Sequence, residues 1–140
     1  MLIKTYELTA DDFTQAGSIS SDIRKIAKGY GMSQETIRRV AVACYEAEIN
    51  MIIHSHGGQI ELSIDDEWFN IAFKDVGPGI ENIELAMKPG WSTADVVAQN
   101  MGFGAGLGLP NIKKNSDTFN LFSDPNGTLL QLGFKRKDTL

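Results

Sequence analysis

The most constraining feature of the sequence is one segment, residues 34–54, that reads as a long helix with apolar side chains on almost every side. Ser33 precedes it as a predicted N-cap, and Glu35 places an acid in its first turn. The apolar positions are Ile37, Val40, Val42, Cys44, Tyr45, Ala47, Ile49, Met51, Ile52 and Ile53. A helix of this kind is buried on most faces, so the rest of the chain must pack around it.

Length and charge narrow the class of protein further. A chain of 140 residues buries about 70% of its unfolded surface, enough for one core, so we expect a single domain over residues 1–140. The formal net charge of −5 gives no basic surface for a phosphate backbone, so nucleic-acid binding is not expected. No segment approaches about 18 apolar residues, and the lone Cys44 cannot close an intrachain disulfide. We therefore expect no membrane span, no export and a cytoplasmic location.

Shorter elements surround the long helix. Thr9 and Asp12 form a predicted capping pair that starts a first helix, and this helix ends near Gly29. A short helix is expected through Lys114, after the last glycine of a glycine-rich run. Alternation predicts strands over 3–8, 60–64, 69–73, 119–123 and 128–134, the last two joined by an Asp-Pro-Asn-Gly turn.

Glu46 and Asn50 are the polar residues of interest on the long helix. They are four residues apart, so they lie about 40° apart on one face. A carboxylate can accept a proton from a nucleophile, and an amide oxygen suits a hydrated Mg²⁺ ion. The alternative interpretation is a solvated helix edge, because this spacing alone is a weak pattern.

Asp75 follows three apolar strand residues and falls, by the period of two, on the same inward face. A buried acid needs a donor, which an adenine amino group supplies and a guanine carbonyl does not. Gly77 and Gly79 follow it and would let a ligand approach the backbone closely. The alternative is an ordinary turn after a strand.

A second glycine motif follows an aperiodic stretch over residues 76–101 that is typical of a functional lid. Gly102, Gly104, Gly106 and Gly108 alternate ahead of a predicted helix. Their backbone N–H groups and the helix amino end suit a polyphosphate. A flexible glycine loop without a ligand is the alternative.

In this order and spacing, the three motifs resemble the N, G1 and G2 boxes of the GHKL superfamily of Bergerat-fold ATP-binding domains. The resemblance covers about residues 33–134. It implies an α+β two-layer sandwich with a mixed, mainly antiparallel sheet and helices on one face. It also implies that Glu46 is the general base, that Asn50 binds Mg²⁺, and that Asp75, Gly77 and Gly79 bind adenine. The phosphates of ATP would bind at Gly102, Gly104, Gly106, Leu107 and Gly108, and Thr128 would face the adenine site from the last strand.

Within the superfamily, the segments 75–87, 90–93 and 106–113 are especially similar to stand-alone anti-sigma-factor kinases of the RsbT type. This resemblance implies an ATP-dependent serine/threonine kinase whose partner is a STAS-domain protein. Two rival functions share the same site: a nucleotide-gated module that sequesters a sigma factor, and a plain ATPase in which Glu46 activates water. The sequence leaves a homodimer open.

Overall fold

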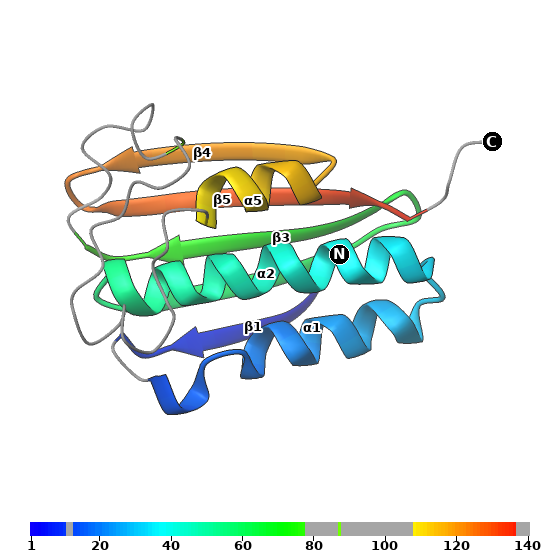
Figure 1. Cartoon of the computed structure of the whole chain (residues 1–140), viewed down its shortest axis with the longest axis horizontal. Helices are drawn as coiled ribbons and strands as arrows, with labels where there is room; N and C mark the ends of the chain where they lie inside the picture. The colour runs from blue at the N-terminus through cyan, green and yellow to red at the C-terminus, as the bar shows by residue number, and fades with distance from the viewer. Residues whose placement is uncertain (11–12, 78–86, 88–107, 137–140) are drawn as a thin grey trace.

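The computed structural model describes residues 1–10, 13–77, 87 and 108–136, and these form two layers. One layer is a sheet in the order β1-β2-β3-β5-β4, with every described strand pair antiparallel. Its strands are β1 (Leu2–Leu8), β2 (Gly58–Ile64), β3 (Trp68–Asp75), β4 (Thr118–Asp124) and β5 (Gly127–Lys135). The other layer holds the helices α1 (Ser18–Gly29), α2 (Gln34–His54) and α5 (Gly108–Asn115), all on one face of the sheet (Figure 1). The predicted α+β two-layer sandwich is confirmed.

The core lies between the helices and the inner face of the sheet. Strand residues alternate between this core and the open face, as the period of two requires. The buried strand residues are Ile60, Leu62, Ile64, Phe69, Ile71, Phe73, Leu130, Leu132 and Phe134, and the helices add Ile23, Ala27, Val40, Ala43, Cys44, Ala47, Met51, Ile52 and Ile112. The opposite face of the sheet carries residues such as Gln59, Lys74 and Gln131, which are exposed. A site formed by helices and strands together can therefore lie only on the face of the sheet that the helices cover.

The central helix α2 has the predicted bounds. The Ser33 hydroxyl accepts a hydrogen bond from the Thr36 N–H at 3.2 Å, which is the expected N-cap. After His54 the chain turns at Gly57, whose φ of 95° is left-handed. α2 packs against α1 on one side and α5 on the other. None of the described helices is long and apolar enough to cross a membrane.

The predicted start of the first helix is wrong. α1 begins at Ser18, after a short 3₁₀ turn over Phe13–Gln15 and a left-handed Gly17, with no side-chain cap from its own segment. Its free N–H groups are bound instead by Glu48 on α2. Oε2 of Glu48 accepts from Gly17 at 3.0 Å and Ile19 at 3.4 Å, and Oε1 accepts from Ser20 at 2.8 Å. A tertiary contact therefore replaces the local cap that Thr9 and Asp12 suggested.

Replacing Glu48 by Gln tests this tertiary cap. Glu48 is 1% exposed, and an amide offers one acceptor oxygen and an NH₂ group that faces backbone donors. We expect the free energy of unfolding to fall by about 1–3 kcal/mol, the cost of leaving a buried donor unpaired. The measurement is urea denaturation. The matched control is Glu35→Gln in the exposed first turn of α2, which should cost less than about 1 kcal/mol; equal losses would contradict the cap.

Candidate functional site

The polar face of α2 meets the start of α5. A Cβ atom added at Gly108 would lie 2.9 Å from Nδ2 and 3.0 Å from Oδ1 of Asn50. A real side chain at Gly108 would therefore have to displace the Asn50 amide, and only glycine allows this close approach. Asn50 and Gly108, the last glycine of the predicted phosphate motif, are thus neighbours in space. A shared nucleotide site would require this proximity.

Glu46 lies one turn before Asn50 on the same helix. It is half-buried, and this burial raises the pKa of its carboxyl above the ordinary glutamate value of 4.5. A raised pKa makes the carboxylate a stronger base. Glu46 is therefore a partly desolvated acid on the helix face that also carries Asn50.

Asp75 ends β3 and is bound by the last strand. Its Oδ1 accepts a hydrogen bond from the Thr128 backbone N–H at 2.8 Å. The Cβ of a larger residue at Gly127 would overlap the Asp75 carbonyl oxygen, so glycine is needed there. Burial raises the pKa of Asp75, although the Thr128 hydrogen bond and the nearby His56 pull it down. Among the described residues, the hydrogen bond from Thr128 is the one that the Asp75 carboxylate accepts.

Backbone hydrogen bonds fix the end of β3 against both neighbouring elements. The His56 N–H donates to the Val76 carbonyl at 2.7 Å, and the Val76 N–H donates to the Gly57 carbonyl at 3.0 Å. The Gly77 N–H donates to the Asn126 carbonyl in the β4–β5 turn at 3.2 Å. Gly77 also passes close to Ser55, where an added Cβ would lie 3.3 Å from the Ser55 Cα atom. Asp75 is therefore held at a fixed position beyond the carboxyl end of α2.

These pieces gather at one end of the sandwich. The carboxyl ends of α2 and β3, the start of α5 and the β4–β5 turn all lie at the left of Figure 1. Asn50, Asp75, Gly77 and Gly108 therefore belong to elements that meet at this end, and Glu46 lies one turn before Asn50 on α2. Thr128 joins them through its N–H, while its hydroxyl pairs with that of Ser123 at 2.8 Å. The expected lid over 76–101 lies mostly outside the described residues, as do Gly79, Gly102, Gly104, Gly106 and Leu107.

The side-chain oxygens of Asn50 and Asp75 fit a nucleotide that binds together with a hydrated cation. In the described part of the chain, no group of three or more His, Cys, Asp or Glu side chains could hold a metal ion. An amide oxygen such as that of Asn50 suits Mg²⁺, which usually keeps several waters and binds substrate phosphates as well. Asp75 offers a half-buried acceptor for a base amino group.

Residues 9–134 match the histidine kinase-like ATPase domain family, and the chain belongs to that family. The serine/threonine-protein kinase RsbT of Bacillus subtilis (strain 168) is 32% identical over 104 residues, which cover 71% of this chain and 72% of RsbT. The predicted family and the similarity to RsbT are therefore confirmed. Membership of this ATPase family implies the use of ATP.

Two anti-sigma F factors are also similar to the chain. That of Clostridium beijerinckii is 38% identical over 76 residues, 49% of this chain and 53% of the relative. That of Clostridium acetobutylicum is 41% identical over 75 residues, 49% of this chain and 52% of the relative. The match thus spans about half the length of each anti-sigma factor.

Solved structures agree on the fold. The RsbU and RsbW domains of Rv1364c from Mycobacterium tuberculosis superpose with a TM-score of 0.62 at 13% identity, covering 96% of this chain and 34% of that one. The SiaB–SiaC complex from Pseudomonas aeruginosa gives a TM-score of 0.56 at 12% identity, covering 95% of this chain and 91% of that one. At these identities the likeness shows the fold alone.

A methyl group at Gly108 tests the contact with Asn50. In Gly108→Ala the new Cβ pushes the Asn50 amide aside, so we expect Mg²⁺-dependent ATP affinity to fall about tenfold, as for a lost hydrogen bond or ligand contact. Calorimetry with and without Mg²⁺ measures this loss. The control is Gly29→Ala in α1, where an added Cβ meets nothing within 4 Å. Unchanged nucleotide binding in a folded Gly108→Ala variant would contradict the assignment.

Proposed function

We propose that this chain is a Mg-ATP-dependent protein serine/threonine kinase of the RsbT type that phosphorylates a STAS-domain partner in a bacterial partner-switching circuit. The observation that carries the proposal is the half-buried Glu46, one helical turn from the contact between Asn50 and Gly108. The similarity to RsbT supports protein phosphorylation. In this proposal residues 1–140 are a single cytoplasmic ATP-binding domain, and a homodimer is left open.

The proposal gives each site residue one role. Oδ2 of Asp75 accepts a hydrogen bond from the adenine amino group, and Gly77 and Gly79 let the ring approach. The amide oxygen of Asn50 binds Mg²⁺, which would neutralise phosphate charge when bound. Backbone N–H groups from Gly102 to Gly108, including Gly104, Gly106 and Leu107, bind the phosphates. Thr128 holds Asp75 in place through its N–H.

Glu46 acts on the acceptor. Its carboxylate accepts the proton of a serine or threonine hydroxyl, and the hydroxyl oxygen bonds to the γ-phosphorus of ATP. The bond between the γ-phosphorus and the bridging oxygen breaks, and ADP leaves with that electron pair. Burial helps, because it raises the pKa of Glu46 and makes it a better proton acceptor.

A second candidate function is a nucleotide-gated module that sequesters a sigma factor with little turnover. The similarity to two anti-sigma F factors favours it, since those proteins are named as acting against a sigma factor. A plain ATPase uses the same site with water in place of the hydroxyl. Phosphate on a protein partner separates the first function from the other two.

The test incubates the protein with labelled ATP and STAS-domain proteins of the same genome. We expect label on one partner, and Glu46→Gln should slow transfer by about 10²–10⁴ while ATP affinity changes only a few fold. Transfer by the wild type should fall as the pH drops through the pKa of Glu46, because the protonated carboxyl cannot take a proton. Burial places this acid limb above the ordinary glutamate value of 4.5.

The control is Glu35→Gln, the same chemical change in the exposed first turn of α2, which should transfer at the wild-type rate. Normal transfer by Glu46→Gln would remove Glu46 from its role. Tight binding of a sigma factor by the wild type, with no labelled partner, would instead favour the sequestering module.

A further inference from the structure

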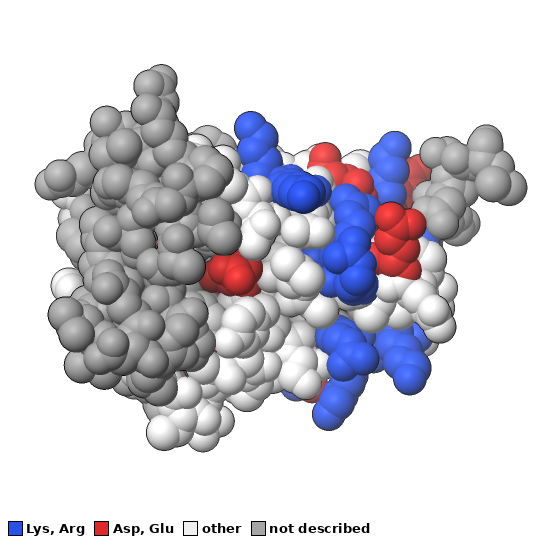
Figure 2. All heavy atoms as spheres, in the orientation of Figure 1, with Lys and Arg blue, Asp and Glu red and all other residues white. Residues whose placement is uncertain are grey.

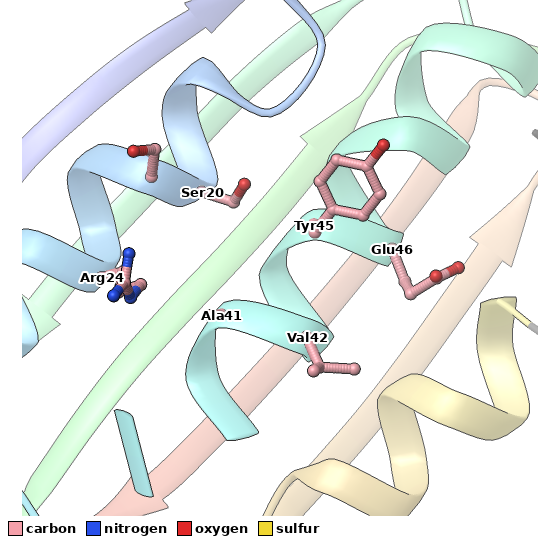
Figure 3. A pocket seen from close by; sticks show the side chains of 7 residues that line it. Ser20, Arg24, Ala41, Val42, Tyr45 and Glu46 are labelled. Carbon is pink, nitrogen blue, oxygen red and sulfur yellow. The ribbon is translucent and has the colours of Figure 1, made fainter. Parts of the chain in front are cut away.

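An open depression of about 390 Å³ lies over the outer side of α1 and α2. It is lined by Ser20, Ser21 and Arg24 from α1 and by Ala41, Val42, Tyr45 and Glu46 from α2. Figure 3 shows Arg24 projecting from α1, and Val42, Tyr45 and Glu46 from α2. The depression therefore combines an apolar part with a cation, and it reaches the proposed base.

Arg24 and Glu46 carry the charges that line the depression, and further cations lie beside it on both helices. The chain carries a formal net charge of −5, yet Lys and Arg side chains gather on the helical face in Figure 2. Lys28 lies one turn from Arg24 on α1, and Arg38 lies one turn from Val42 on α2. The three cations are exposed, and Val42 is partly buried. Glu35, one turn before Arg38, offsets part of the positive charge of Arg38. Most of the positive charge beside the depression therefore comes from Arg24 and Lys28.

Two other acids of these helices, Asp22 and Glu48, are already engaged, whereas Glu46 itself lines the depression. Asp22 accepts hydrogen bonds from the Lys4 ammonium at 2.8 Å and the Tyr6 hydroxyl at 2.5 Å. Glu48 is buried and binds the first turn of α1. The positive charge of Arg24 and Lys28 is thus not cancelled by these carboxylates, and it can meet acids of another protein.

The depression and the nucleotide end lie on opposite sides of Glu46 along α2. Asn50, which lies against Gly108 of α5, follows Glu46 toward the carboxyl end of α2. Ala41 and Val42 precede it toward the amino end. An acceptor that enters over the depression would therefore approach Glu46 from the side opposite to Asn50, which leaves the Asn50 side to the nucleotide.

The walls of the depression are preformed. The Ser20 N–H is bound to Glu48 at 2.8 Å, which fixes the first turn of α1 against α2. Tyr45 lies against Gly17, where an added Cβ would be 3.2 Å from the Tyr45 ring. The backbone on both sides of the depression is thus fixed before a partner docks, so docking loses little free energy in ordering the backbone.

We propose that this depression is the docking site for an acidic segment of the protein substrate, held by Arg24 and Lys28 and leading its hydroxyl to Glu46. The inference rests on the proposed kinase function and adds the surface and the charge by which the substrate is chosen. Apolar contacts over Ala41 and Val42 give affinity, and the cations select acidic partners.

The test is the kinetics of transfer from Mg-ATP to the STAS-domain proteins of the same genome. Arg24→Glu should raise KM for the acceptor protein about tenfold or more, because a like charge now faces the acidic segment, with kcat and KM for ATP unchanged. Salt should raise the wild-type KM and lower the KM of Arg24→Glu, since screening weakens the attraction in the wild type and the repulsion in the variant. The matched control is Lys135→Glu, the same charge change on the exposed opposite face of the sheet.

The outcomes separate the two proposals. A labelled acceptor with a raised KM in Arg24→Glu alone supports both. A labelled acceptor with the same KM in wild type, Arg24→Glu and Lys135→Glu overturns the docking site and leaves the kinase in place. Equal rises in both variants would mean a general charge effect and also overturn the docking site. No label on any acceptor overturns the kinase, and the docking site falls with it.

Discussion

Burial of α2 is the constraint on which the rest of the structure depends. Its apolar residues face the sheet, and α1 and α5 cover its two sides. Three polar residues of α2 therefore lie in different surroundings. Glu48 is buried and binds the start of α1, Glu46 is half-buried, and Asn50 meets Gly108. The packing of one helix thus places both the proposed base and the proposed metal ligand.

The end of β3 supplies the other half of the site. A carboxyl group on the core side of a sheet costs free energy unless donors meet it. The Thr128 N–H meets one oxygen of Asp75, while burial raises the pKa of this carboxyl. A ligand amino group at the second oxygen would relieve part of that cost. This is the physical basis for proposing Asp75 as a binding group.

The sequence predicts best what local signals determine. The bounds of α2 follow from the Ser33 cap and the Gly57 turn, and the inward position of Asp75 follows from the strand period. The predicted start of α1 is wrong because the side chain that caps this helix, Glu48, lies 31 residues from Gly17 in the chain. Local sequence signals do not reveal such a distant cap. The hydrogen bond from the Thr128 N–H to Asp75 joins residues that are 53 positions apart in the sequence. Strand parity places both on the core face, but only the pairing of β3 with β5 brings them into contact. The roles of Gly79 and of Gly102 to Leu107 stay predictions.

The central claim is that Asp75 makes this end of the sandwich an adenine nucleotide site. Calorimetry of Mg-ATP and Mg-GTP with the wild type and Asp75→Asn tests it most directly. We expect ATP to bind and GTP to bind much more weakly, because a guanine carbonyl would face the carboxylate. Asp75→Asn should weaken ATP binding by about 1–3 kcal/mol, the cost of a lost buried hydrogen bond. Equal affinity of the wild type for ATP and GTP, or an unchanged ATP affinity in a folded Asp75→Asn, would contradict the account.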